Sequence, residues 1–583
     1  MKNKILIIVL IAALSLSYSC EDVLDRTPLD KVSDSDVWVK QSLLEGYVLD
    51  LIARFPSGAF RDEFLFTDEG TGSSGNSNAL TTGTMSKGSI PADLEYWNYE
   101  YIRDCNIFLE KIGTTPIPDA AKKQLEGEVR FLRAGAYLEM AKRYGGVPLV
   151  TTVIDPYAPI ADDLKVRKKE LEIHEFIDTE LTTSAQLLSA IVAKKPTARI
   201  NKWTALALKS RANLWAASIA KFSTVQINGI VGVPADKANE YYKKASDAAN
   251  EVINSGVYTL YKGKTDKAVN YQYIFLEEGN SEVLFAKEYN GIEVKHDWDH
   301  WKAPSRFASG QGSRCNPTLD FILRYENMDG TTEDYTKYFN EKNLYANGLE
   351  IFKNKDPRLF ATVLFQGSFF VNDFITTYEG IDTAKVPTPS KIVNNPNLSY
   401  EGFKHVGVDS RLVIGDDKTT NSGFLVRKWC DESKLPIPAV TSQVDWPIIR
   451  LAEVYLTKAE ADFQLGNTAA AVTALNATRS RAGISLVDDK TISMQKIQTE
   501  WMAEFAFENK RFWDLRRWRI ADQVLNNQFK GLRIIWHKKS NKYYFLPLNA
   551  EPFNRIFRQE HYYNPISNAR INNNPMLVQN PLY

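Results

Sequence analysis

Cysteine is scarce in this chain of 583 residues, and its distribution excludes a disulfide framework. The cysteines are Cys20, Cys105, Cys315 and Cys430, and no two of them form a C-x-x-C pair. Zinc sites and redox pairs depend on short spacings of that kind. One disulfide among the last three is possible from the sequence, but free thiols packed as small apolar side chains are the favoured interpretation.

Net charge is also missing, because 71 Lys and Arg residues balance 71 Asp and Glu residues. A chain without a basic body has no overall electrostatic attraction to nucleic acid, so we expect no nucleic-acid partner. The sequence has no P-loop, no glycine fingerprint for a dinucleotide and no Gly-x-Ser-x-Gly elbow. We therefore expect no cofactor, no metal site and no catalytic residues.

Long apolar runs are confined to the N-terminus. Ile5 to Leu14 is apolar throughout, follows Lys2 and Lys4, and leads through small and polar residues to Cys20. This is the order of a secretory signal peptide. The run has only about half of the roughly 20 residues that a membrane-spanning helix needs. We predict a signal peptide over residues 1–19, with Cys20 as the acylated first residue of a lipoprotein.

Two segments show the apolar spacing of amphipathic helices. In 125–144, apolar side chains recur every three or four residues until Gly145-Gly146 ends the pattern. A second stripe occupies 447–465 and breaks at Gly466-Asn467, after which another helix is predicted to end near Gly483. The sequence therefore predicts two helices joined by a tight turn in this second region.

That helix pair has small residues where two helices approach closely, as tetratricopeptide repeats do. Ala459 and Ala461 precede the turn, and Ala471 follows it. Similar pairs are predicted for 203–220 with 239–255, and for 96–112 with 119–144. One helical hairpin cannot bury its apolar face alone, so such units are expected to stack.

Long stretches of different composition separate the helical blocks. Residues 66–92 are rich in Gly, Ser, Thr and Asn, 290–320 mix Trp, His and Asp, and 365–430 contain short β-prone runs. Loops of this length inside a domain are usually functional. We predict a mainly α fold, an α-α superhelix of tetratricopeptide-like repeats, with long irregular loops and few short strands.

A series of motifs, in order along the chain, identifies a family resemblance. They are Cys20 to Asp25; Glu128 to Ala134 followed by Tyr144-Gly145-Gly146-Val147-Pro148; Lys355-Asp356-Pro357-Arg358; Ile449 to Leu456; Phe507 to Trp518; and the closing Gln579-Asn580-Pro581-Leu582-Tyr583. Together they resemble the SusD/RagB family of Bacteroidetes outer-membrane nutrient-binding lipoproteins. Glu500-Trp501, where the family usually has Glu-Arg, is a modest departure.

The resemblance implies one body over residues 20–583, with an N-terminal part over 20–225 and a C-terminal part over 280–583. It also implies a surface-exposed lipoprotein, held in the outer membrane by its lipid, that captures glycans for a SusC-like TonB-dependent transporter. Some members bind peptides or other nutrients on the same scaffold, and that alternative stays open.

The cluster from His296 to Trp301 is the most suggestive site in the sequence. On a helix, Trp298 and Trp301 would lie three residues apart and could form one platform for a sugar ring. Burial of one or both indoles is the competing interpretation, because tryptophan is mostly buried. His296 and His300 also have the spacing of a zinc pair, but no third ligand is evident.

Three further residues complete the predicted glycan site. The resemblance places ligand loops near residues 66–98 and 290–320, so Asp68, Trp97 and Arg314 join Trp298 and Trp301 as hypothetical contacts. The sequence of these loops varies with the ligand in the family, so the residues are proposed by region.

Charged residues elsewhere have a structural interpretation. Arg511 and Asp514 lie three apart on a predicted helix and could pair. We interpret the segment from Arg511 to Trp518 as part of a buried ion network that fixes the C-terminal segment onto the repeats. Glu453 and Glu460 are expected to bond neighbouring helices and to have no acid–base role.

Overall fold

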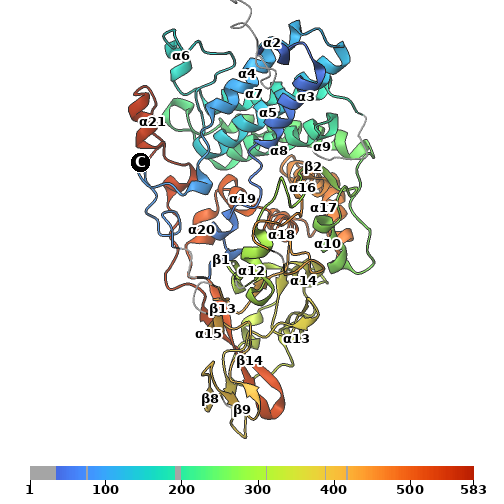
Figure 1. Cartoon of the computed structure of the whole chain (residues 1–583), viewed down its shortest axis with the longest axis vertical. Coiled ribbons are helices and arrows are strands. Elements are labelled where there is room, and N and C mark those ends of the chain that lie inside the picture. Colours follow the sequence, from blue (N-terminus) through green and yellow to red (C-terminus); the bar gives the residue numbers. More distant parts are fainter. Residues whose placement is uncertain are drawn as a thin grey trace, which may run out of the picture.

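The computed structural model describes residues 34–73, 77–190, 199–309, 311–387, 389–414, 418–436 and 438–583. The predicted signal peptide over residues 1–19 and the predicted lipidation site Cys20 lie outside these residues. The body is elongated, with long helices at one end and the longest strands toward the other (Figure 1).

Helices dominate the described residues, as the amphipathic patterns predict. They are α2 (Asp34–Val37), α3 (Gln41–Ala53), α4 (Tyr99–Lys111), α5 (Asp119–Tyr144), α6 (Asp162–Lys165), α7 (Glu170–Leu187), α8 (Lys202–Phe222), α9 (Ala238–Asn254), α10 (Lys267–Leu276), α11 (Trp298–Lys302), α12 (Leu319–Arg324), α13 (Gly348–Phe352), α14 (Pro357–Thr362), α15 (Arg411–Ile414), α16 (Leu451–Gln464), α17 (Thr468–Ala482), α18 (Met494–Glu504), α19 (Arg511–Arg517), α20 (Ala521–Leu525) and α21 (Asn568–Asn573).

The long helices form one continuous stack. Helix α4 packs on α5, α5 on α7, α7 on α8, α8 on α9, α9 on α16 and α16 on α17. The predicted pairs α4–α5, α8–α9 and α16–α17 are therefore confirmed, as is the tetratricopeptide-like architecture. Helix α7, which lies between two of these pairs, was not predicted.

The end of α5 shows why the polypeptide chain changes direction after Tyr144. Gly145 has φ +76, a left-handed conformation that glycine adopts without strain. Its neighbour Gly146 lies against backbone, because a Cβ there would be 1.9 Å from the carbonyl oxygen of Lys168. The predicted stop at this glycine pair is confirmed.

Strands are short apart from one hairpin. The strands are β1 (Gly70–Thr71), β2 (Val283–Lys287), β3 (Asn316–Pro317), β4 (Val363–Leu364), β5 (Phe369–Phe370), β6 (Asp373–Phe374), β7 (Ile381–Asp382), β8 (Ile392–Val393), β9 (Ser399–Tyr400), β10 (Phe403–Lys404), β11 (Leu425–Val426), β12 (Trp446–Arg450), β13 (Lys530–His537) and β14 (Lys542–Asn549). The largest sheet has the order β14-β13-β7-β8, and the β13–β14 hairpin was not predicted.

One predicted helix begins later than expected. Residues 447–450 belong to β12, which pairs antiparallel with β2, and α16 starts only at Leu451. Pro447 lacks the N–H that a helix interior requires, and the Ile448-Ile449 pair suits a buried strand. The predicted segment 447–465 is therefore a strand followed by a helix.

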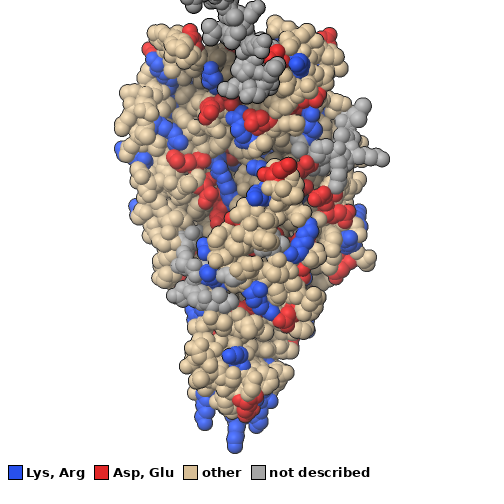
Figure 2. All heavy atoms as spheres, in the orientation of Figure 1, with Lys and Arg blue, Asp and Glu red and all other residues tan. Residues whose placement is uncertain are grey.

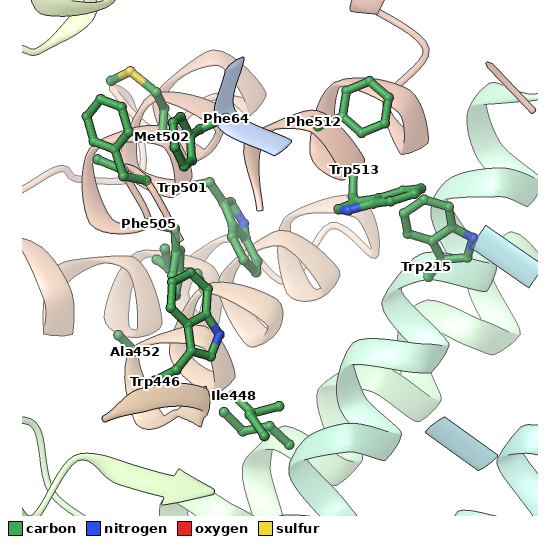
Figure 3. Close-up of a cluster of buried hydrophobic side chains, with 14 of the residues drawn as sticks. Phe64, Trp215, Trp446, Ile448, Ala452, Trp501, Met502, Phe505, Phe512 and Trp513 are labelled. Atoms are coloured by element: carbon green, nitrogen blue, oxygen red, sulfur yellow. The ribbon is translucent and has the colours of Figure 1, made fainter. Parts of the chain in front are cut away.

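Aromatic side chains fill the junction between the helical stack and the C-terminal helices (Figure 3). Trp215 from α8 lies beside Trp513 from α19, with ring centroids 6.3 Å apart. Trp446 on β12 and Trp501 on α18 belong to the same buried cluster. Cys105, Cys315 and Cys430 are free and buried, which confirms the interpretation of the cysteines as apolar packing.

A buried ion network holds this junction together. Glu504 on α18 receives bonds from Arg450 at the end of β12, from Arg481 on α17 and, at 2.8 Å, from Arg358 on α14. Burial alone would raise the pKa of Glu504, but the three arginines hold it well below its ordinary value. Elements far apart in the sequence thus meet at one carboxylate.

Among the described residues, no helix combines the length and apolar character that a bilayer crossing requires.

Replacing Glu504 with alanine should strongly destabilise the fold. The change leaves three buried guanidinium groups short of a partner, which typically costs about 3–5 kcal/mol of unfolding free energy. Urea unfolding of the wild type and Glu504→Ala measures the loss. Glu341→Ala, at an exposed position, is the control and should stay within about 0.5 kcal/mol of the wild type. Equal losses for both variants would show that the network adds nothing.

Candidate functional site

Trp298 is part of the core and not of a surface platform. Its side chain is 2% exposed, and its indole N–H donates to the carbonyl oxygen of Lys428 at 3.2 Å. Phe64 and Trp429 pack edge-on against its ring. Helix α11 spans only five residues, and it turns this indole inward. The predicted pairing of Trp298 with Trp301 as one sugar platform is therefore wrong.

Trp301 and Arg314 are brought together at the surface. The guanidinium carbon of Arg314 lies 4.2 Å from the centre of the Trp301 indole, and the Arg314 N–H donates to the Trp301 carbonyl at 3.0 Å. The indole N–H donates to the carboxylate of Asp297, and Gln311 accepts from Arg314 at 3.3 Å. We call these four half-buried residues the α11 patch.

The α11 patch combines groups that suit a ligand rich in hydroxyl groups. An indole offers an apolar face, while guanidinium, amide and carboxylate groups supply donors and acceptors around it. Strands β1 and β3 pair beside it, joining residues 70–71 to 316–317. The four paired residues are buried, so segments that the sequence separates by more than 200 residues meet in the interior, close in sequence to Arg314.

Asp68 lies in the core, in an ion pair. Its two carboxylate oxygens accept from Arg511 at 2.9 Å each, and the Nε of Arg324 lies 2.7 Å from one of them. Burial opposes ionisation, but the two guanidinium groups lower the pKa of Asp68 to about 2. The prediction of Asp68 as a glycan contact is wrong, because its side chain is fully buried.

The spacing of three residues suggested that Arg511 pairs with Asp514, but Arg511 pairs with Asp68 instead. Asp514 pairs instead with Arg517 at 2.8 Å, and Arg517 also bonds Glu460 on α16. Glu453 bonds Arg211 on α8 and Lys510. The structural interpretation of the segment and of both glutamates is confirmed, with different partners for Arg511.

Trp97 lies on a different surface. Its indole packs edge-on against Tyr144 at 5.0 Å, with the guanidinium of Arg570 at 5.5 Å from its centre. It lines a cleft of about 800 Å³ together with Pro148, Ile160 and Met576. None of the residues that line this cleft belongs to the α11 patch. The C-terminal residues of this cleft could not be predicted from local patterns, because they lie more than 470 positions from Trp97.

The two histidines of the cluster do not share an open face. The imidazole of His296 stacks on Phe60 at 3.8 Å, and its Nε2 lies 3.1 Å from the carbonyl oxygen of Val444. Burial lowers the pKa of His296 to about 4. His300 is buried. Over the described part of the chain, no group of three or more His, Cys, Asp or Glu side chains is arranged to hold a metal ion.

Charges of both signs are interspersed on the face shown in Figure 2. This distribution agrees with the zero net charge and presents no broad field of one sign.

A stack of tetratricopeptide-like helices that carries a small patch of aromatic and hydrogen-bonding groups is the architecture of a binding protein. A model described as "SusD family" matches residues 281–583, and a second, described as "Starch-binding associating with outer membrane", matches residues 29–214. The chain belongs to the SusD family, whose members are non-catalytic binding proteins of polysaccharide utilisation that associate with the outer membrane.

Known relatives cover nearly the whole chain. The starch-binding protein SusD of Bacteroides thetaiotaomicron is 25% identical over 523 residues, which are 86% of this chain and 81% of the relative. A SusD-like protein of Bacteroides fragilis has a similar structure, with a TM-score of 0.71, 26% identity, and coverage of 96% of this chain and 100% of the other. A SusD-like carbohydrate-binding protein of the same species has a TM-score of 0.69 at 23% identity, and the match covers 93% of this chain and 99% of the other.

Trp298→Ala should lower stability, because removal of a buried indole leaves a large cavity. We expect a loss of about 3–5 kcal/mol of unfolding free energy. Trp301→Ala is the matched control, three residues away on the same helix and half-buried, and should lose clearly less. Denaturant unfolding of both variants makes the comparison. A larger loss at Trp301 would contradict the assignment of the two indoles.

Glu69→Gln should flatten the pH dependence of stability. Burial raises the pKa of Glu69 to about 8, and its Oε1 accepts the Phe507 N–H at 2.8 Å. The folded chain therefore holds a proton that the unfolded chain releases near pH 4.5. The stabilisation of the fold by protonated Glu69 is therefore complete below about pH 4.5. This stabilisation is lost as the pH rises through about 8, by up to about 1.4 kcal/mol of unfolding free energy per pH unit.

Urea unfolding at pH 6 and at pH 8.5 tests this expectation. The wild type should lose more stability than Glu69→Gln between the two values, whereas Glu341→Gln should behave as the wild type. Parallel losses in the wild type and Glu69→Gln would mean that Glu69 is already ionised at pH 6.

Proposed function

We propose that the chain is a cell-surface lipoprotein that captures an oligosaccharide or polysaccharide and delivers it to a SusC-like, TonB-dependent outer-membrane transporter. The family membership over residues 281–583 carries this proposal. The second match, over residues 29–214, has a description that includes both starch binding and outer-membrane association. Two of the relatives named above, a starch-binding protein and a carbohydrate-binding protein, also support it.

The α11 patch is the proposed place of glycan contact. Trp301 would cover one face of a pyranose, and Arg314, Gln311 and Asp297 would bond its hydroxyl groups. These side chains already contact one another, so little conformational entropy remains to be lost on binding. Trp97 remains a predicted contact, at the separate cleft beside α21.

Attachment to the membrane is assigned to Cys20. Acylation there would hold the body at the surface of the outer membrane, and stable anchoring needs more than one acyl chain. Glu21 and Asp22, directly after it, resemble the acidic signal that sends such lipoproteins to the outer face.

The mechanism is capture followed by gating. The glycan binds to side chains held on the helical scaffold, and the protein then closes over the transporter to commit the ligand to import. No bond is broken, which agrees with the non-catalytic character of the family.

Peptide binding is the second candidate function, and the Trp97 cleft favours it. The cleft is lined mainly by apolar side chains, among them Ile160, Leu164 and Met576. Apolar pockets of several hundred Å³ accept side chains of a peptide more readily than hydroxyl-covered sugars.

Trp301→Ala should lower the affinity for the bound glycan about tenfold, equivalent to about 1.4 kcal/mol. The measurement is binding of the body over residues 21–583 to a broad polysaccharide panel, by calorimetry or affinity electrophoresis. Tyr157→Ala is the control, because Tyr157 is 96% exposed and outside the patch, and it should bind as the wild type.

Each other outcome has a defined meaning. Undiminished binding by Trp301→Ala would remove the α11 patch from the site while keeping the function. No binding to any polysaccharide by the wild type would contradict glycan capture and favour peptides.

A further inference from the structure

The hairpin of β5 and β6 presents two phenylalanines to solvent. Phe369 and Phe374 are directly opposite each other across the hairpin and are 53% and 57% exposed. Their ring centroids are 5.5 Å apart at an interplanar angle of 71°, so the rings form a corner. Phe370, the next residue along β5, is fully buried. We call Phe369 and Phe374 the phenylalanine corner.

The corner is held firmly against the body by Arg306. Its guanidinium bonds the carboxylate of Asp373, donates to the carbonyl oxygen of Phe374 at 2.7 Å and donates to Asp409 at 2.8 Å. Phe307 packs between this clamp and the core, with its ring 5.4 Å from that of buried Phe370. A two-stranded hairpin is weak in isolation, so these bonds to the body fix the position of both exposed rings.

The turn of the hairpin is conformationally costly. Val371 and Asn372 have φ of +47 and +64, the left-handed conformations of a two-residue turn. Asparagine tolerates this region, but a β-branched valine there is an outlier. Strain of this kind persists only where the surroundings impose it, and it is frequent at ligand contacts.

The chemistry of the corner fits a pyranose. Two phenyl rings offer apolar faces without hydrogen bonds, while Asn372 and Asp373 on the exposed side offer an amide and a carboxylate. Arg306 already bonds two aspartates, so its guanidinium is neutralised and offers no free positive charge to an anionic ligand. A neutral, hydroxyl-bearing ring with an apolar face is the ligand that matches these groups.

The residue that clamps the corner is close in the chain to the α11 patch. Arg306 follows Trp301 by five residues, so their Cα atoms lie at most about 18 Å apart. Ser305 Oγ and Ser313 Oγ lie 3.1 Å apart, so the neighbour of Arg306 in the chain contacts the neighbour of Arg314. A glycan chain of several residues can span such a distance.

We propose that the phenylalanine corner is a second glycan contact, and that the protein therefore prefers long chains that reach both the corner and the α11 patch. This inference rests on the proposed function. Binding at two linked positions converts the second contact into an intramolecular one, so affinity rises with chain length beyond what either contact supplies.

The test compares Phe369→Ala/Phe374→Ala with the wild type on two ligands. The ligands are the polysaccharide that the wild type binds best and a disaccharide or trisaccharide cut from it. The double variant should bind the polysaccharide about tenfold more weakly and the short fragment unchanged. Phe369→Leu/Phe374→Leu, which keeps apolar bulk without aromatic faces, should lose most of the same affinity.

Other results overturn the inference in distinguishable ways. Unchanged polysaccharide affinity would exclude the corner from the glycan site, and an equal loss for the short fragment would make it a structural support of the α11 patch. Unchanged glycan affinity with weakened association to the transporter would make it a protein contact. No glycan binding by the wild type would reject both the proposed function and the inference.

Discussion

The placement of the candidate site depends on the buried charges around Glu504. Arg450 bonds Glu504, Glu508 and Glu282, so the end of β12 is tied to α18 and to the start of β2. Glu508 also accepts from Lys428 at 2.8 Å, and the carbonyl of Lys428 accepts the indole N–H of Trp298. A continuous series of bonds therefore runs from the core of the repeat stack to α11, and Trp301 stands on the outer side of that short helix. Burial of so many charges costs free energy of folding unless each charge is paired, which explains why these residues bond one another.

The motifs that identify the family are largely the residues of such networks. Asp356 and Arg358 come from one motif, Arg450 from the next and Glu508 from the C-terminal one, and all meet near Glu504. The closing motif acts in the same way, since Asn580 bonds the carbonyl of Tyr144, directly before the glycine pair that ends α5. Such residues specify how distant segments dock. The side chains of Asp356, Arg358, Arg450, Glu508 and Asn580 are buried, so their bonds join segments of the fold to one another.

The sequence predicted what local periodicity determines and missed what distant partners determine. The apolar stripe of 125–144 fixes a helix because one face must be buried, and α5 ends at the predicted glycine pair. Asp68 gave no such signal: its partner Arg511 is 443 positions away, so a carboxylate in a polar segment appeared to be a ligand contact. Trp298 and Trp301 illustrate the same limit. Spacing of three places two side chains on one face of a long helix, but α11 has little more than one turn, and packing against Phe64 and Trp429 decides which indole is buried.

The bonds that hold the proposed contact groups constrain how the proposed gating can work. Trp301 is held by Arg314 and Asp297, and the phenylalanine corner by Arg306, so neither surface needs to fold around a ligand. Preformed contacts lose little side-chain entropy on binding, but each offers only a small apolar area, so one sugar ring gains little at either place. Under the proposed function, affinity is then expected to come from one glycan chain that engages several places. In the proposed function, capture and closure are therefore separate steps: a bound glycan leaves these contacts unchanged, and closure over the transporter is expected to be a movement of the whole body. The buried networks agree with this expectation, because they tie distant segments of the body together.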